Sequence, residues 1–283
     1  MPVQSIDPFL KVPVGPLAIV NRLTVDGSNQ TPLKFSLVIP TFNEGQNIRE
    51  IVSSLSELLD RAIPANYELI VVDDDSPDRT WELAAELIAD YPQLRVMRRE
   101  TERGLATAVV RGWQAARGEI LGVIDADLQH PPEILLKLWD EMEKGAELAV
   151  ASRNVEGGGV SEWRLARRFL SRGAQMLGLA ILPEVIGRLS DPMSGYFMVR
   201  RSSIVNKQLN PVGYKILIEV AARGQIRWIS EVGYVFRERV AGASKVTWKQ
   251  YVEYIQHLVK LRFSLWPVAR FFRNISDRSD RAD

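Results

Sequence analysis

The sequence predicts an α/β fold in which helices cover a mainly parallel central sheet. Between Phe35 and Ala151, short continuous apolar runs alternate with longer segments whose apolar residues recur at helical spacing. Continuous apolar strands are typical of a parallel sheet that is buried on both faces. The polar motifs of this half follow the apolar runs directly, and parallel sheets bind ligands at the carboxyl ends of their strands.

The elements of the first half can be assigned in order. Each strand is an apolar run bounded by polar residues, namely Phe35–Ile39, Tyr67–Val72, Leu94–Met97, Glu119–Ile124 and Glu147–Ala151. The amphipathic segments between them predict helices over Asn47–Arg61, Thr80–Asp90, Gly104–Ala116 and Glu133–Lys144. Pro131 and Pro132 precede the last of these helices, where proline suits the first turn.

The pattern changes after Arg153, where a glycine-rich loop follows. A long arginine-bearing helix is expected over Trp163–Leu182, and a final amphipathic helix over Thr247–Leu265. Shorter strands are expected between them, around Tyr196–Arg200, Arg227–Ile229 and Tyr234–Arg237.

Composition excludes several classes of protein. The 283 residues are 46% hydrophobic and 25% charged, which are globular values, and the net charge of +1 indicates no nucleic-acid partner. The absence of cysteine excludes disulfides and thiolate sites and fits a reducing compartment. His130 and His257 lie too far apart in sequence to predict a multi-histidine metal site. No run reaches the roughly 20 apolar residues that span a bilayer.

The strongest motif is the segment Asp125-Ala126-Asp127-Leu128-Gln129-His130, which follows a predicted strand. Carboxylates that flank Ala126 at a strand end can converge on one hard divalent cation, with Gln129 as a further oxygen donor. Such a cation keeps positions open for the oxygens of a substrate diphosphate. The alternative for an isolated motif of this kind is a solvated acidic turn.

A second acidic motif, Asp73-Asp74-Asp75-Ser76-Pro77-Asp78, closes the second strand. Its carboxylates can accept hydrogen bonds from ribose hydroxyls or a base N–H. Ser76 and Asp78 are interpreted instead as turn and helix-cap residues before Thr80. Asp74 is kept as a candidate ligand contact.

An ordered set of motifs carries a family resemblance. The set is PTFNE, VVDDDSPDRT, RGLATAV, DADLQHPPE, ASRNVEGGG, DPMSGYF, GYKILIE and FRERVAGASK. It resembles dolichyl-phosphate mannose synthases and bacterial polyprenyl-phosphate glycosyltransferases, which are inverting family 2 glycosyltransferases of GT-A fold. The resemblance covers residues 35 to 265. It implies a GT-A catalytic domain (35–246), which an amphipathic membrane-interface helix (247–273) and a polar tail (274–283) follow. The prolines and the polar stretch 26–30 of the first part predict a loosely ordered leader over 1–34.

The same resemblance implies roles for individual residues. The expected nucleotide contacts are Pro40, Phe42, Glu44, Val72 and Asp74. The expected sugar-nucleotide contacts are Asp125, Ala126 and Asp127, and the expected ligands of Mg²⁺ or Mn²⁺ are Asp125, Asp127 and Gln129. The expected catalytic residues are Asp127 and the acceptor-phosphate ligands Arg153, Arg167 and Ser171. Arg239 and Lys245 match the positions that neutralise the donor diphosphate, and Phe42 stands where the mannose synthases commonly have tyrosine. His130 is interpreted as structural.

The implied reaction moves a hexose onto a polyprenyl or dolichyl phosphate, with GDP-mannose as the favoured donor. UDP-glucose with undecaprenyl phosphate is the first alternative, and a non-catalytic nucleotide-sugar-binding protein is the second. Arg153 and Arg167 argue against a saccharide hydroxyl as acceptor. An ionised lipid phosphate needs positioning more than deprotonation, because the second pKa of a phosphate monoester is about 6.

A polyprenyl acceptor implies contact with a membrane surface. Two segments, Arg164–Leu182 and Trp248–Arg273, combine basic residues with apolar or aromatic ones in a way that suits a bilayer interface. The alternatives are a helix packed on the catalytic domain and a dimer contact. We therefore expect a cytoplasmic protein attached peripherally to the cytoplasmic face of a membrane, with a homo-oligomer or a membrane partner protein left open.

Overall fold

A computed structural model describes residues 8–19, 33–160, 165–237 and 248–265, with no side-chain detail for 165–172 and 248–249. The described part is built around a seven-stranded sheet in the order β3-β2-β1-β4-β7-β5-β8. Its strands are β1 (Leu33–Thr41), β2 (Tyr67–Asp73), β3 (Leu94–Arg98), β4 (Gly118–Val123), β5 (Leu148–Ser152), β7 (Phe197–Arg200) and β8 (Ile229–Gly233). Every pairing in this sheet is parallel except those of β7, which runs antiparallel to β4 and β5. The predicted mainly parallel α/β fold is confirmed.

The strand order places a ligand-binding crevice beside β1. From β1 the chain steps outward through β2 to β3, then returns to pair β4 with the other side of β1. Ligands of open parallel sheets bind at such a reversal, outside the carboxyl ends of the strands. The motif after β1 and the motif after β4 both lie at this point.

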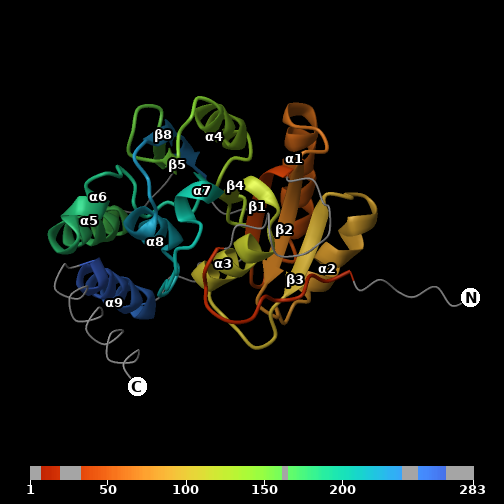
Figure 1. Cartoon of the computed structure of the whole chain (residues 1–283), viewed down its shortest axis with the longest axis horizontal. Coiled ribbons are helices and arrows are strands. Elements are labelled where there is room, and N and C mark those ends of the chain that lie inside the picture. Colours follow the sequence, from red (N-terminus) through yellow and green to blue (C-terminus); the bar gives the residue numbers. More distant parts are fainter. Residues whose placement is uncertain (1–7, 20–32, 161–164, 238–247, 266–283) are drawn as a thin grey trace, which may run out of the picture.

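Helices cover both faces of the sheet (Figure 1). One face packs on α1 (Ile48–Ala62), α2 (Thr80–Glu86), the 3₁₀ turn Leu87–Ala89 and α4 (Ile134–Glu143). The other packs on α3 (Leu105–Ala115), α6 (Pro183–Ile186), α7 (Arg201–Ile204) and α8 (Ile216–Arg223). The buried strands contribute to two cores, one on each side, because successive strand residues point to opposite faces.

The helices α5 (Leu165–Ile181) and α9 (Trp248–Leu265) pack against each other (Figure 1). In addition, α5 packs against α6 and α9 packs against α8. The Tyr254 hydroxyl donates a hydrogen bond of 3.0 Å to the Ala174 carbonyl, and His257 Nε2 lies 2.7 Å from Glu219 Oε2. One face of α9 is therefore held on the domain. Its outward side chains include Val252, Ile255, Val259 and Phe263, the last of them 65% exposed.

Several second-half predictions need correction. The helices α6, α7 and α8 have no counterpart among the predicted elements. The strand predicted at Arg227–Ile229 is wrong in position, since β8 begins at Ile229. The backbone N–H groups of Arg227 and Trp228 instead donate to the Glu147 carboxylate, so a side chain holds them before the sheet ladder begins. A short parallel pair, β6 (Gly159–Val160) with β9 (Val235–Phe236), accounts for the last predicted strand.

Part of the predicted loose leader packs on the domain. Phe9 bridges to Val96 of β3, and the Leu10 N–H donates to the Val96 carbonyl at 2.6 Å. Ile19 is fully buried and bridges to Val205. Residues 8–19 are therefore part of the packed structure rather than a loose leader, because their apolar side chains find partners on the sheet edge and on α3 and α7.

Candidate active site at the carboxyl ends of the strands

The motifs predicted from the sequence meet at one cavity of about 820 Å³. Its walls come from the ends of β1, β2 and β4, the start of α3, the loops 193–195 and 211–215, and α9. The predicted site residues that line it are Pro40, Phe42, Glu44, Asp74, Asp125, Ala126, Asp127, Gln129 and Arg153. Residues far apart in sequence are thus brought together at the crevice that the strand order predicts.

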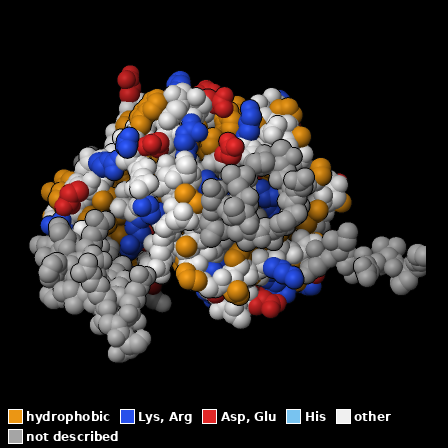
Figure 2. All heavy atoms as spheres, in the orientation of Figure 1, with side chains coloured by type: hydrophobic (Ala, Val, Ile, Leu, Met, Phe, Trp, Pro, Cys, Tyr) orange, Lys and Arg blue, Asp and Glu red, His pale blue; other side chains and the backbone are white. Residues whose placement is uncertain are grey.

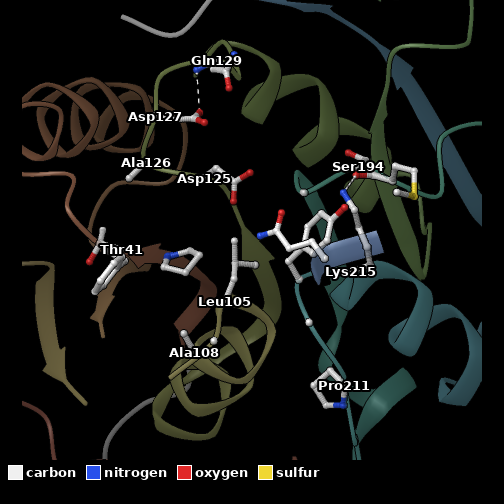
Figure 3. Close-up of a pocket in the computed structure, with 18 of the residues that line it drawn as sticks. Thr41, Leu105, Ala108, Asp125, Ala126, Asp127, Gln129, Ser194, Pro211 and Lys215 are labelled. Carbon is white, nitrogen blue, oxygen red and sulfur yellow. Dashed lines mark hydrogen bonds between the residues drawn. The ribbon is translucent and has the colours of Figure 1, made fainter. Parts of the chain in front are cut away.

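The acidic motif after β4 enters the cavity as a short turn (Figure 3). The Asp125 side chain is 30% exposed, whereas Asp127 and Gln129 are nearly buried. The Gln129 N–H donates to Asp127 Oδ1 at 3.1 Å, and Leu128 between them has a φ of 60°. Gln129 Nε2 donates to the Arg237 carbonyl at 3.1 Å. This hydrogen bond fixes the orientation of the Gln129 side-chain amide and therefore the position of its oxygen. Two carboxylates and an amide oxygen are ligands of the type that Mg²⁺ and Mn²⁺ prefer, so these residues fit the predicted cation.

His130 supports the acidic turn. Its ring is buried against Tyr196, Tyr234 and Phe236, with centroid distances of 5.5, 5.3 and 5.2 Å. Its Nε2 lies 3.6 Å from Asp125 Oδ2. The packing agrees with the structural role expected for His130, and it places a ring nitrogen behind the most exposed carboxylate of the turn.

Gly195 makes room for that carboxylate from the other side. A Cβ atom at this position would lie 2.9 Å from Asp125 Oδ2, closer than real Cβ atoms approach their neighbours. The absence of a side chain here therefore lets the 193–195 loop close over Asp125.

Asp74 lines the cavity, and both of its oxygens accept hydrogen bonds from the protein. Arg99 donates to Oδ1 through Nε at 2.7 Å and through Nη2 at 2.5 Å. The Gly104 N–H donates to Oδ2 at 2.6 Å. Because the Arg99 side chain is 0% exposed, Asp74 balances a fully buried charge and holds the loop before α3.

The neighbouring acidic residues have local roles. Ser76 donates to Asp73 through both its N–H and its hydroxyl, at 2.8 and 2.6 Å. Asp78 Oδ1 accepts the Thr80 N–H at the start of α2. Burial raises the pKa of Asp73, while its hydrogen bonds from Ser76 act in the opposite direction. The interpretation of Ser76 and Asp78 as turn and cap residues agrees with these contacts.

The predicted nucleotide contacts do not all reach the cavity. Pro40, Phe42 and Glu44 line it, and Glu44 Oε2 accepts a 2.8 Å hydrogen bond from Asn47. Val72 is 0% exposed and packs in the hydrophobic core between the sheet and α3, so its side chain does not reach the wall. β2 residues alternate between the two faces of the sheet, and the one at position 72 points into the core.

Arg153 follows β5 and forms a buried pair with Asp191. Nε donates to Asp191 Oδ2 at 2.6 Å and Nη2 donates to Oδ1 at 2.7 Å, so one edge of the guanidinium is used. Burial alone would raise the pKa of Asp191, but the hydrogen bonds and charge of Arg153 hold that pKa below its ordinary value. The remaining groups of the Arg153 side chain lie at the cavity wall beside the Phe236 ring.

Four predicted site residues fall where the structure gives no side-chain detail. Arg167 and Ser171 lie on α5, and Arg239 and Lys245 lie outside the described residues. Conversely, the cavity contains residues to which no role was assigned from sequence, among them Arg103, Lys215 and Tyr234. Arg103 and Lys215 belong to the quoted motifs RGLATAV and GYKILIE, so the motifs alone could have directed attention to them.

Comparison with known families assigns the chain to a family. The model of the family described as glycosyl transferase family 2 matches residues 36–206. The chain belongs to glycosyl transferase family 2. This membership confirms the family predicted from the ordered motifs.

Named relatives of this family 2 glycosyl transferase include enzymes from archaea and fungi. This chain is 44% identical to the dolichol-phosphate mannosyltransferase of Pyrococcus furiosus over 81% of its own residues. The match spans 64% of that relative's length. It is 33% identical to the dolichol-phosphate mannosyltransferase of Saccharomyces cerevisiae, covering 81% of this chain and 87% of the relative. The dolichol-phosphate mannosyltransferase of Mycosarcoma maydis is 35% identical to this chain, and the match covers 82% of this chain and 81% of the relative.

Solved structures support the fold of this glycosyl transferase. Glucosyl-3-phosphoglycerate synthase from Mycobacterium tuberculosis, in complex with Mn²⁺, UDP and glucosyl-3-phosphoglycerate, superposes with a TM-score of 0.59. The two chains are 23% identical, and the match covers 82% of this chain and 80% of the other. This similarity establishes a shared fold, and the predicted GT-A fold is confirmed.

Proposed function

We propose that this chain transfers mannose from GDP-mannose to a polyprenyl or dolichyl phosphate, giving a lipid-phosphate-linked sugar with inverted configuration. The observation that carries the proposal is the cavity in which the acidic turn Asp125–Gln129 faces the buried Arg153–Asp191 pair. Relatives that are 33% to 44% identical and are named dolichol-phosphate mannosyltransferase favour mannose over the glucose alternative.

On the donor side, Asp125, Asp127 and Gln129 would hold a Mg²⁺ or Mn²⁺ ion. Such an ion supplies Lewis-acid stabilisation to a leaving nucleoside diphosphate. Pro40, Phe42 and Glu44 lie along the wall where β1 ends and form the nucleotide side, and Asp74 lines the same cavity. Arg239 and Lys245 are assigned to the donor diphosphate by their motif, as additional positive charge.

On the acceptor side, Arg153 positions the phosphate, together with Arg167 and Ser171 of α5. Arginine suits this task because its planar group gives parallel charge-assisted hydrogen bonds to phosphate oxygens. Asp191 occupies the Nε–Nη2 edge and so orients the guanidinium at the wall. A phosphate oxygen attacks the anomeric carbon, the bond to the nucleoside diphosphate breaks, and the diphosphate leaves with the bonding electrons. No carboxylate base is required, because the acceptor is already ionised.

A lipid acceptor requires a surface that meets the membrane. Several outward residues in the described parts of α5 and α9 are apolar, among them Met176, Leu179, Ile255 and Phe263, and the exposed Gln256 and Lys260 lie beside them on α9. Figure 2 shows hydrophobic side chains over α5 at the left of the view. None of the helices within the described ranges is long and apolar enough to cross a bilayer. We therefore assign this α5–α9 face to peripheral contact with the cytoplasmic surface of a membrane.

The test is a transfer assay. Purified protein is mixed with a polyprenyl phosphate, Mg²⁺ or Mn²⁺, and labelled GDP-mannose or UDP-glucose in separate reactions. Label should enter the organic phase from GDP-mannose, and a chelator should abolish the transfer until excess cation is added back.

Two aspartate variants sharpen this assay. Asp127→Asn removes one carboxylate charge from the turn and should reduce transfer by at least about 100-fold, the scale of a lost electrostatic contact in a transition state. Asp140→Asn makes the same change on the exposed side of α4 and should leave transfer unchanged. Undiminished transfer by the Asp127 variant, or transfer from neither donor by the wild type, contradicts the proposal.

A further inference from the structure

The Tyr234 hydroxyl is a buried polar group at the cavity wall to which the proposed function assigns no role. The side chain lines the cavity and is 2% exposed. The hydroxyl forms no hydrogen bond with any of the described residues. Buried hydroxyls in folded proteins are nearly always hydrogen-bonded, because leaving one unpaired is costly. An unpaired hydroxyl at a ligand cavity therefore indicates a partner that arrives with the ligand.

The backbone and the ring of Tyr234 are both held in place. Its N–H donates a hydrogen bond of 3.1 Å to the carbonyl of Ser152, the residue that precedes Arg153 of the acceptor half. Its ring packs against the His130 ring at a centroid distance of 5.3 Å. On the donor half, His130 Nε2 lies 3.6 Å from Asp125 Oδ2. Tyr234 is thus fixed between the two halves of the site.

The charges that act on the hydroxyl come from both halves. Burial raises the pKa of Tyr234 well above its ordinary value. The Arg153 guanidinium lowers this pKa, and three carboxylates raise it, namely those of Asp191, Asp125 and Asp127. The phenol therefore stays protonated near neutral pH and can donate its hydrogen to an acceptor oxygen.

The group that lies between the two halves during transfer is the hexose. Its anomeric carbon is bonded to the diphosphate at the acidic turn and is attacked by the phosphate at Arg153. The proposed function assigns charged ligands to the phosphate groups on both sides and none to the hydroxyls of the sugar. A neutral O–H donor suits the oxygen of a neutral hydroxyl group.

We propose that the Tyr234 hydroxyl donates a hydrogen bond to a hydroxyl of the transferred hexose and so contributes to the selection of the sugar. This inference rests on the proposed function, because it names a sugar contact in the same site. A site that hydrogen-bonds a substrate hydroxyl discriminates against an analogue without that hydroxyl, since its own polar group is then left unpaired.

A purely structural role for the hydroxyl has a different signature. Tyr67, at the start of β2, is a matched control, because its hydroxyl donates to Asp60 Oδ1 at 2.8 Å and its side chain does not line the cavity. Tyr67→Phe breaks that hydrogen bond, so it should lower the melting temperature and leave sugar binding unchanged. Tyr234→Phe removes a hydroxyl that has no partner among the described residues, so the melting temperature should stay the same or rise.

The experiment measures binding by calorimetry with Mg²⁺ for the wild type, Tyr234→Phe and Tyr67→Phe. The ligands are GDP, GDP-mannose and the monodeoxy derivatives of GDP-mannose, each of which lacks one hydroxyl of the hexose. The wild type should bind one of these derivatives about tenfold more weakly than GDP-mannose, the scale of one hydrogen bond. Tyr234→Phe should bind GDP-mannose about tenfold more weakly than the wild type does, and should no longer distinguish that derivative from GDP-mannose. GDP should bind equally to all three proteins.

The inference is overturned if the wild type binds every monodeoxy derivative as tightly as GDP-mannose, a result that requires no variant. It is also overturned if Tyr234→Phe discriminates among the derivatives as the wild type does, loses GDP affinity equally, or melts at a lower temperature. Failure of the proposed function would look different. If the wild type binds GDP-mannose through this hydrogen bond but transfers no mannose to a polyprenyl phosphate, the inference stands and the proposed function is refuted.

Discussion

Replacing Arg153 with alanine should destabilise the fold as well as remove an acceptor ligand. The guanidinium is joined to Asp191 by hydrogen bonds of 2.6 and 2.7 Å, and the Asp191 side chain is 1% exposed. Removing one partner leaves a buried carboxylate without its counter-charge, which costs about 3 to 5 kcal/mol in other proteins. A substitution made to test catalysis will therefore also lower stability.

The structure favours the lower end of that range. The backbone N–H of residue 153 donates to Asp191 Oδ2 at 3.1 Å and is unaffected by the substitution, and Lys215 remains nearby. A loss of about 3 kcal/mol corresponds to a melting temperature lower by roughly 6 to 12 °C in a domain of this size.

The loss should depend on pH in a defined direction. In the wild type the folded-state pKa of Asp191 is held below its ordinary value, so the pair stabilises the fold above that ordinary value. This contribution is lost as the pH falls through the folded-state pKa. In Arg153→Ala, burial without the guanidinium should raise the pKa of Asp191, so acidification protonates it and relieves the penalty. The difference in stability is thus largest near neutral pH and shrinks below about pH 5.

Urea unfolding monitored by circular dichroism at neutral and acidic pH measures this difference. The double variant Arg153→Ala/Asp191→Ala removes both charges and should be more stable than Arg153→Ala alone. If the two sites were independent, the stability losses of the two single substitutions would instead add. An Arg153→Ala protein that unfolds at the wild-type midpoint at both pH values would show that the pair does not stabilise the fold, and the reasoning would fail.

Two further substitutions test the donor side. Gly195→Ala places a Cβ atom 2.9 Å from Asp125 Oδ2 and should displace the carboxylate by a few tenths of an ångström. The displacement should lower kcat/KM for transfer about tenfold and leave the melting temperature unchanged. In the control Gly173→Ala, the added Cβ atom meets no atom of the described residues within 4 Å, so this variant should keep full activity. Equal activity in both variants contradicts the packing argument. Asp74→Asn removes the carboxylate nearest to the buried Arg99 and leaves it Glu102 at 3.3 Å, so it should lower the free energy of unfolding by about 3 kcal/mol in urea titrations. Wild-type stability with lost GDP affinity would instead make Asp74 a nucleotide ligand alone.

Much of the fold was readable from local sequence. Continuous apolar runs mark strands that are buried on both faces, and the helical spacing between them marks the covering helices. The acidic turn after β4 was equally readable, since Asp125, Asp127 and Gln129 follow one strand within five residues of each other. Such features depend on neighbours in sequence, so they require no knowledge of the tertiary structure.

Other features depend on which distant segments pack together. The antiparallel β7 lies between β4 and β5, and no periodicity distinguishes that position from an edge. Asp191 pairs with Arg153 across 38 residues, and Lys215 approaches the same pair from the start of α8. Local patterns predict an element and its buried face but not its partner, because pairing is selected by the free energy of the whole packed core. The acidic half of the site therefore follows from sequence, whereas the charge balance of the acceptor half emerges only from the fold.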